Sequence, residues 1–324
     1  MTLTKPQSDA VRLLRGLAIL SVVCIHNTPA TVVQVYVRPF LNFSVGLFLF
    51  LSGMLSSAER WQPQKRLRKV LIPYVLWTAL YVIFQNLTAM RAIPFAFVKA
   101  LLTGSGSLAM YYIFVYCEFT LLIPWIERLA GSRYKYWGFL ITPLEILFAR
   151  LLPLLLGIEV TGIFWILRRL SCVGWFTFFY LGYLLGNEKI TLQCKPRALW
   201  GLWALSLIPQ LLESYAHWLF LDSTNCGAQL KLTSVFSDVL LVLLAYRFIC
   251  TKTTPSPRLL TSLGDCSFGI YFSHLLVMQA LSAIPYYDTV LPFPLKAFIA
   301  LAVSFGCGLL GKKLLRKHSG YLAL

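Results

Sequence analysis

The chain has 324 residues, of which 58% are hydrophobic and only 13% are charged, and its mean hydropathy is +0.72. Soluble domains carry about a quarter charged residues, so this composition excludes a water-soluble protein and indicates that the bilayer is the main solvent. The net charge of +17 would fit nucleic acid, but the basic residues stand in short clusters between apolar runs, which is how membrane topology is encoded. We therefore expect membrane lipid as a partner and no nucleic acid.

The first ten residues are polar and carry no small-residue cleavage pattern. We therefore expect no removable signal peptide, and the first apolar stretch should be a retained span. A span needs about 20 mainly apolar residues. Ten stretches meet this requirement, at residues 11–33, 39–58, 70–90, 109–129, 136–156, 170–186, 199–219, 232–249, 259–284 and 290–310.

An even number of spans puts both termini on the same side of the membrane. On this topology, 21 of the 29 Lys and Arg residues fall on the N-terminal side and the other eight on the opposite side. Lys and Arg are enriched in cytoplasmic loops. The sequence thus predicts an all-α integral membrane protein with about ten transmembrane helices and both termini in the cytoplasm. It would be a single domain over residues 1–324.

The first apolar stretch holds two polar side chains that are eleven residues apart, Arg15 and His26. At ~100° and ~1.5 Å per residue, they share one helix face and are roughly 16 Å apart along the axis. Arg15 then lies near the cytoplasmic surface and His26 lies deep, toward the outer half of the bilayer. A histidine at that depth faces a bundle interior or a hydrated cavity. It is either a general base or a structural residue bonded to a neighbouring helix.

Arg15, ten residues and then His26 resemble the first-helix signature of acyltransferase family 3, the integral-membrane acyltransferases of bacterial surface sugars. Four further segments follow in the family's order. They are similar to the second-helix motif ending in Ser-Gly, the basic segment leading into Pro-Tyr, the glycine-bearing helix in mid-chain and the late Ser-x-Gly-x-Tyr-x-x-His segment. These segments are residues 45–55, 65–77, 178–186 and 267–274.

Two positions depart from the family pattern. Arg12 stands three residues before Arg15, where the family commonly has an acidic residue, and Asp9 lies a turn further back. The fourth-helix segment reads Met110-Tyr111-Tyr112 and lacks the family's tryptophan. The sequence carries no appended extracytoplasmic domain, so it is most similar to stand-alone members, including those that acetylate O-antigen or enterobacterial common antigen.

The resemblance implies a membrane O-acyltransferase of the bacterial inner membrane. Such an enzyme moves an acyl group, by default acetyl, from cytoplasmic acyl-CoA to a sugar hydroxyl. The acceptor would be a surface polysaccharide or its lipid-linked precursor, as in lipopolysaccharide biosynthesis. His26 would be the catalytic base, and acetyl-CoA would be the donor substrate. The sequence shows no metal site, since its eight cysteines lack metal-ligand spacing and those in apolar stretches are interpreted as small buried hydrophobes.

The basic segment at residues 60–69 is expected to be a cytoplasmic loop, and it offers phosphate ligands for such a donor. Arginine forks match phosphate oxygens, and lysine acts as a point charge. With the resemblance, this favours Arg66, Arg68 and Lys69 as donor-binding residues, and Arg15 belongs to the same cytoplasmic surface. Arg60 and Lys65 are interpreted as membrane anchors under the positive-inside rule.

Other polar residues in apolar stretches are candidates to line a channel or bind substrate. Ser52 precedes Gly53, a small residue that lets helices approach closely. Ser267, Tyr271 and His274 share one helical face. Glu118 is an intramembrane carboxylate, and Glu118, Asp238 and Asp265 are alternatives for orienting His26. Each of these polar residues could instead serve interhelical packing or hydrogen bonding.

A different class of function stays open, a transporter or flippase of a lipid-linked sugar, which would also explain many spans and buried polar residues. It would need no acyl-CoA site. A non-catalytic scaffold explains neither His26 nor its phasing with Arg15. The sequence leaves the oligomeric state open.

Overall fold

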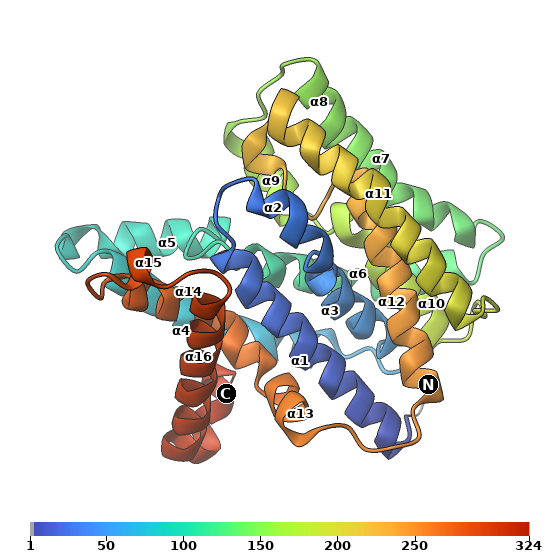
Figure 1. Ribbon diagram of the computed structural model, residues 1–324. Coiled ribbons are helices and arrows are strands. Elements are labelled where there is room, and N and C mark those ends of the chain that lie inside the picture. Colours follow the sequence, from blue (N-terminus) through green and yellow to red (C-terminus); the bar gives the residue numbers. More distant parts are fainter. Residues whose placement is uncertain (1–2, 324) are drawn as a thin grey trace. The chain divides into compact units, whose positions relative to one another are not determined.

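The computed structural model describes residues 3–323, and every regular element in that range is helical (Figure 1). The ends of the predicted 1–324 domain, residues 1, 2 and 324, lie outside the described residues. The fold therefore agrees with the predicted all-α class. The chain forms two compact units, each of which is described by itself.

The first unit comprises the described residues up to Trp61, together with Ile123–Val160 and Val173–Asp265. The division between the units falls within α6 (Tyr111–Ala130), and the C-terminal part of this helix belongs to the first unit. Its other elements are α1 (Lys5–Asn27), α2 (Val33–Val37), η1 (Arg38–Phe40), α3 (Phe43–Met54), η3 (Lys135–Leu140), α7 (Ile141–Ile146), η4 (Leu147–Leu151), α8 (Leu152–Leu155), η5 (Val173–Trp175), α10 (Phe176–Gly186), α11 (Pro196–Phe220), η6 (Ser223–Asn225), α12 (Leu232–Thr251) and α13 (Arg258–Asp265).

Glycines bring helix backbones together in the first unit. A Cβ at Gly53 of α3 would lie 2.1 Å from the carbonyl oxygen of Phe179 in α10, and one at Gly182 of α10 would lie 2.0 Å from that of Phe50. No side chain fits at such distances. The prediction that Gly53 permits close helix packing is therefore confirmed, and all residues of α10 are buried.

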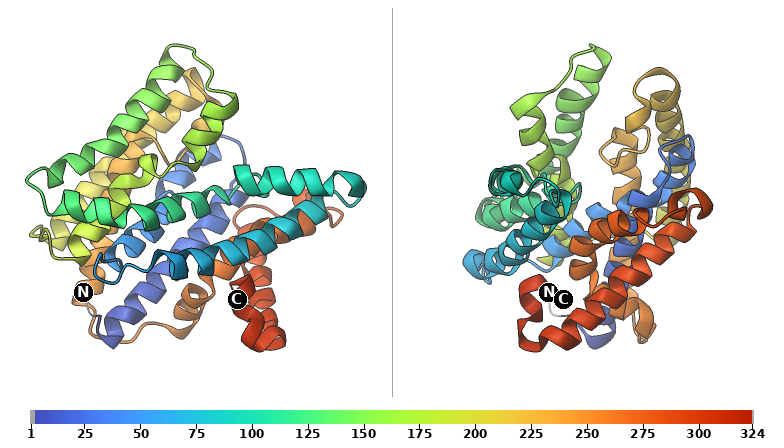
Figure 2. Two further views of the ribbon diagram at one scale, coloured as in Figure 1. Left: turned by 180° about the vertical axis from the view of Figure 1, so that it is seen from behind. Right: turned by 90° about the vertical axis from the view of Figure 1, so that its left-hand side faces the viewer.

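α1 packs along α13 in the same way, and the two helices lie side by side in Figures 1 and 2. A Cβ at Gly264 would lie 1.8 Å from the carbonyl oxygen of Arg12. The Arg12 side chain then reaches across to α13, where its Nε donates to Asp265 Oδ1 at 2.7 Å and its Nη2 pairs with Oδ2. Nη1 contacts Asp9 Oδ1 at 3.2 Å. Arg12 thus ties α1 to α13 through Asp265, and its pair with Asp9 lies within α1.

The second unit contains residues 62–122, Thr161–Cys172 and the described residues from Cys266 onward. It includes the first part of α6. Its other elements are α4 (Pro63–Gln85), η2 (Met90–Ala92), α5 (Ile93–Thr103), α9 (Gly162–Leu170), α14 (Ser267–Ser282), α15 (Tyr287–Val290), α16 (Leu295–Leu315) and η7 (Arg316–Leu322).

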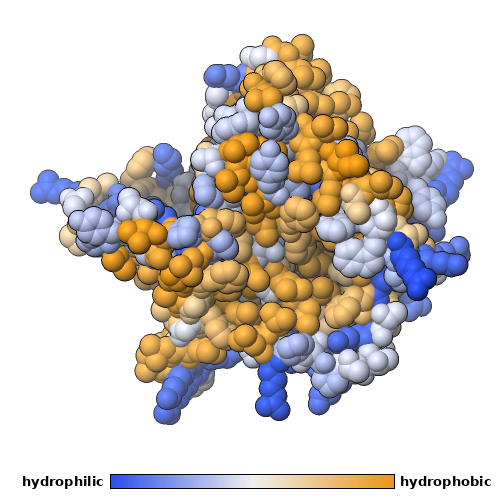
Figure 3. Space-filling model, in the orientation of Figure 1, coloured by the Kyte–Doolittle hydropathy of each residue, from blue (hydrophilic) through white to orange (hydrophobic). Residues whose placement is uncertain are grey.

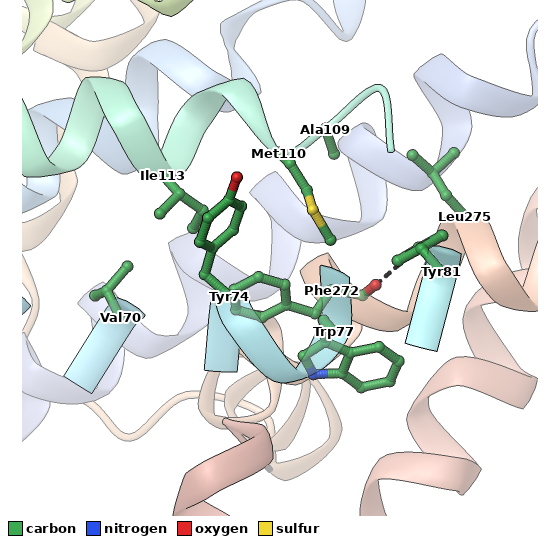
Figure 4. Close-up of a cluster of buried hydrophobic side chains, with 9 residues drawn as sticks. All are labelled: Val70, Tyr74, Trp77, Tyr81, Ala109, Met110, Ile113, Phe272 and Leu275. Carbon is green, nitrogen blue, oxygen red and sulfur yellow. Dashed lines mark hydrogen bonds between the residues drawn. The ribbon is translucent and has the colours of Figure 1, made fainter. Parts of the chain in front are cut away.

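The core of this unit is a cluster on α4, α6 and α14, drawn in Figure 4. Its tyrosine and tryptophan side chains donate hydrogen bonds to backbone carbonyls. Tyr81 Oη donates to Phe272 O at 2.8 Å and accepts from Leu276 N at 2.9 Å. Tyr74 Oη donates to Leu101 O at 2.8 Å. Buried aromatic residues with a polar end need such partners, so the cluster fixes α4 against α5 and α14.

Within the described residues, five helical segments are long and apolar enough to cross a membrane. They are Val33–Met54, Pro63–Gln85, Lys135–Leu155, Leu232–Thr251 and Leu295–Leu315. Each overlaps one of the ten predicted spans, so multiple membrane crossing is supported. Hydrophobic residues also make up most of the surface drawn in Figure 3. The full count of ten and the cytoplasmic location of both termini stay predictions.

Three predicted segments differ from the structure. The basic segment before the third span is not a loop, because α4 begins at Pro63 and carries Lys65–Lys69 in its first turns. The sixth predicted span contains α10 with only 11 residues, roughly 16 Å of helix at ~1.5 Å per residue against a hydrocarbon core of ~30 Å. The ninth is split into α13 and α14, with Cys266 between them.

We expect Gly53→Ala to destabilise the protein, because its methyl group would meet the Phe179 carbonyl oxygen. Overpacking of this kind costs about 1–3 kcal/mol, so the melting temperature of the purified protein in detergent should fall. Gly201→Ala on α11 is the control, since a Cβ there has no atom within 4 Å. Equal melting temperatures for the two variants would contradict the packing assigned to Gly53.

The predicted topology can be measured with reporter fusions. A fluorescent protein fused after the last residue should fold and fluoresce, because the C-terminus is predicted to be cytoplasmic, and alkaline phosphatase at the same point should be inactive. Alkaline phosphatase fused after Asn225, in the connection between α11 and α12, should be active. The opposite pattern would reverse the orientation, and activity at both points would refute the span count between them.

Candidate functional site

Arg15 and His26 both lie on α1, as their spacing predicts, and both are half-buried. α1 covers Lys5–Asn27 without interruption, so the helical phase that places the two side chains on one face is retained. α1 packs against α3, α12 and α13. The sequence-based geometry of this pair is therefore present in the first unit.

His26 lies in the last turn of α1. The carbonyl groups of this turn accept hydrogen bonds from the side chains that follow, with Asn27 Nδ2 donating to Val23 O and Thr28 Oγ1 to Cys24 O, each at 2.8 Å. α1 ends at Asn27, one residue after His26. The C-terminal end of a helix carries partial negative charge, which favours a ring that becomes positive when it takes a proton.

Ser52 lies one residue before Gly53 on α3 and is half-buried. Its carbonyl oxygen accepts from Ser56 Oγ at 2.8 Å, which closes the end of α3. The first unit thus holds Arg15, His26 and Ser52 on two helices that pack together. The channel-lining role of Ser52 stays a prediction.

A basic pocket lies on α4 in the second unit. It has a volume of about 580 Å³ and is lined by Gln64, Lys65, Arg68, Lys69, Ile72, Pro73, Gly320 and Tyr321. The α4 residues recur at spacings of three and four, so they form one face of the helix. Arg68 and Lys69 are two of the predicted donor-binding residues, and the structure brings them together here.

The pocket differs from the prediction in two respects. Arg66 is not among its lining residues, since it lies off the face that carries Arg68 and Lys69. Lys65, which the sequence interpretation treated as a membrane anchor, does line it. Both differences arise because the basic residues lie in the first turns of α4. In a helix, neighbouring residues lie on different faces, whereas a loop imposes no such order.

The chemistry of the pocket suits a phosphorylated ligand. Three cations converge on it, and no Asp or Glu is among the described residues that line it. Ile72 and Pro73 provide an apolar floor beside these charges. Its volume lies within the range of small-molecule sites, ~300–1,000 Å³. An anion with an attached apolar part fits this combination.

Ser267, Tyr271 and His274 lie on α14, as predicted. Tyr271 Oη donates to Ala109 O at 2.5 Å. His274 is fully buried, and its Nδ1 lies 3.0 Å from Ile270 O and 2.7 Å from Tyr271 O. Both neighbours are acceptors, so Nδ1 carries the proton of the neutral ring and Nε2 holds a lone pair.

Glu118 lies on α6, and its Oε2 accepts from the backbone N of Cys172 at 2.6 Å, directly after α9. The other two carboxylates considered for orienting His26 also have defined surroundings. Asp265 pairs with Arg12, and Asp238 is buried in α12. The structure therefore gives Glu118 a local partner in the second unit. Its role in substrate binding stays a prediction.

Sequence reasoning missed a buried polar row between α11 and α12. Lys231 is 5% exposed, and its Nζ donates to Ser214 Oγ and Cys226 O, each at 2.5 Å. Burial lowers the pKa of its ammonium to about 8. The row continues with buried Gln210, whose Nε2 donates to Ser234 Oγ at 3.2 Å. The available signal was polar residues at intervals of three and four on α11, which are Ser206, Gln210, Ser214 and His217.

No group of three or more His, Cys, Asp or Glu side chains among the described residues is placed to hold a metal ion.

Comparison with known proteins gives the context for these residues. Neither the search of curated proteins nor the search of solved structures found a match. A family model described as "Acyltransferase domain" matches residues 8–311. The matched part covers α1 with Arg15 and His26, the basic face of α4, and α14 with His274. The chain therefore belongs to acyltransferase family 3 and is a membrane acyltransferase of that family.

Proposed function

We propose that this acyltransferase is an O-acyltransferase that moves an acyl group, by default acetyl, from cytoplasmic acyl-CoA to a sugar hydroxyl. The acceptor is a cell-surface polysaccharide or its lipid-linked precursor, and the enzyme resides in the bacterial inner membrane. The observation that carries the proposal is the basic pocket on α4. An acyltransferase needs an acyl donor, and acyl-CoA is a donor whose phosphates suit a cationic pocket.

Donor binding is assigned to the cations of this pocket. CoA carries a 3′-phosphate and a diphosphate at its nucleotide end. Arg68 offers a planar fork to phosphate oxygens, and Lys65 and Lys69 offer point charges. In the proposed complex these three side chains neutralise the phosphates, with further positive charge from Arg66 on the same helix. Arg15, on α1 of the first unit, stays a separate predicted donor-binding residue.

Chemistry is assigned to His26. A neutral ring nitrogen takes the proton of the acceptor hydroxyl while the oxygen attacks the thioester carbonyl carbon. The carbon–sulfur bond then breaks, and the CoA thiolate takes up the proton from the imidazolium. The products are an O-acyl sugar and CoA thiol, and the histidine returns to its neutral form. The position of His26 at the negative end of the α1 dipole supports the transient positive charge.

The remaining predicted residues are assigned to substrate contacts. Ser52 in the first unit, and Glu118, Ser267, Tyr271 and His274 in the second unit, are polar groups in largely apolar helices. Such groups mark substrate paths in membrane proteins. We assign each of them to contacts with the acyl arm or the glycan within its own unit.

A transporter or flippase of a lipid-linked sugar is the alternative that this proposal displaces. Such a protein needs no thioester donor and no base. Binding of acyl-CoA with an affinity that depends on the α4 cations separates the two functions.

We expect His26→Ala to abolish transfer without abolishing donor binding. Removing a general base typically costs 10²–10⁴-fold in rate. The measurement uses purified protein in nanodiscs, radiolabelled acetyl-CoA and a lipid-linked glycan extract, with transfer of label to glycan as the readout. Equilibrium binding of acetyl-CoA is measured on the same samples.

Ser304→Ala is the control, since Ser304 is buried on α16 and its Oγ donates only within its own helix, to Ala300 O at 2.7 Å. Transfer that survives in His26→Ala would remove this residue as the essential base. Wild-type protein that binds no acetyl-CoA and transfers no label would replace the enzyme hypothesis by the transporter hypothesis.

We expect the double variant Arg68→Gln, Lys69→Gln to weaken acetyl-CoA binding by at least about 10-fold, because hydrogen bonds to charged groups contribute about 1.5–3 kcal/mol each. The KM for the donor should rise, and kcat at saturation should change little. The control is Lys312→Gln, Lys313→Gln, which removes the same net charge from α16 outside the pocket lining. If both double variants lose affinity equally, general electrostatic attraction explains the binding and the pocket does not.

A further inference from the structure

One wall of the basic pocket comes from the C-terminal segment η7 (Arg316–Leu322). Gly320 and Tyr321 face the same pocket as Arg68 and Lys69 of α4. The family model matches residues 8–311, so this wall lies outside the matched part, whereas the cationic wall lies inside it. The pocket thus combines a wall inside the matched range with a wall outside it.

The backbone directs η7 back onto α4. Arg316 has φ of 45°, which reverses the chain after α16, and η7 contacts both α16 and α4. Trp77 on α4 donates from Nε1 to Leu322 O at 3.1 Å. Leu322 and Ala323 pack against the core cluster that contains Trp77. Figure 4 shows Trp77 within that cluster. The segment is therefore anchored to the core of the second unit at the residue that follows Tyr321.

Tyr321 itself stays accessible. Its side chain is 52% exposed, although the next residue is held against the core. Its ring stacks with that of His318, with centroids 5.9 Å apart and planes at 17°. A flat, accessible aromatic surface therefore stands at a pocket whose other wall is cationic. Proteins that bind nucleotides combine these two features, with aromatic rings stacked on the base and cations on the phosphates.

We propose that η7 forms the nucleobase side of the donor site and that the Tyr321 ring stacks on the adenine of CoA. The inference rests on the proposed function, because it takes acyl-CoA as the donor. It assigns the phosphates to the α4 wall and the base to the η7 wall. It also distinguishes donor classes, since an acyl group carried on the phosphopantetheine arm of a carrier protein brings a phosphate but no adenine.

The first arm of the test measures the affinity of the full-length protein in nanodiscs for CoA. An aromatic ring that stacks on a base contributes to the binding free energy, and loss of the ring weakens binding about 10-fold. This is the effect expected for Tyr321→Ala. Tyr321→Phe keeps the ring and should bind CoA as the wild type does. Tyr36→Ala is the matched control, because Tyr36 is 57% exposed on α2 and does not line the pocket.

The second arm compares two donors in the transfer assay, acetyl-CoA and S-acetyl-pantetheine, which has neither nucleotide nor phosphate. Tyr321→Ala should raise the KM for acetyl-CoA about 10-fold and leave the KM for S-acetyl-pantetheine unchanged. A merely structural role of Tyr321 would impair both donors alike.

Several results would overturn the inference. Equal CoA affinity in wild type and Tyr321→Ala would remove the stacking role while leaving the proposed function intact. Loss of CoA affinity in Tyr321→Phe as well would show that the ring is not the determinant. Wild-type protein that binds no CoA at all would overturn both this inference and the proposed function.

Discussion

The structure depends on one constraint, which is that a chain with a largely apolar surface has to satisfy its polar backbone groups within itself. All regular elements in residues 3–323 are helical, and the exposed carbonyls at helix ends accept hydrogen bonds from nearby side chains. Asn27 and Thr28 do this at the end of α1. The same constraint fixes tertiary contacts, because Tyr74, Tyr81 and Trp77 donate to carbonyl oxygens on other elements. The bond from Trp77 also holds η7 beside the basic pocket.

α4 shows how one helix serves three environments. Its first turns are polar and form the basic pocket around Arg68 and Lys69. Tyr74 and Tyr81, further along, are buried in the core cluster. Another side of the helix is exposed and apolar, with Leu71, Val75, Leu76, Leu80, Ile83 and Phe84. Exposed apolar side chains on a helix of this length suit contact with lipid. The helix that carries the pocket therefore packs against the core on one side and presents an apolar side to lipid.

Much of the architecture was predictable from the sequence, because hydropathy and helical periodicity are local signals. The helical class, the placement of Arg15 with His26 and the shared face of Ser267, Tyr271 and His274 all follow from spacing. The span prediction passed over the break at Cys266, although Gly264, Asp265 and Ser267 interrupt the apolar run of residues 259–284 there. The start of α4 at Pro63 was missed because the residues that follow are strongly basic and resemble a loop between spans. Proline is favoured at the first position of a helix, and that signal was available. Residues of the pocket that are distant in sequence, such as Gly320 and Tyr321, are joined only by tertiary packing, and no local pattern encodes that.

The two walls of the pocket differ in chemistry, which bears on how the proposed donor site would select its ligand. Cations attract any phosphate, so the α4 wall alone does not distinguish CoA from other phosphorylated molecules. Selectivity requires contact with a part of the ligand that competitors lack, and in CoA that part is the base. In the proposed donor site, η7 supplies an aromatic surface for the base, and it is held by the indole-to-carbonyl bond of Trp77 and by the packing of Leu322 and Ala323. On this proposal, changes in η7 refine donor recognition without any change in the helices that carry the proposed catalytic residues.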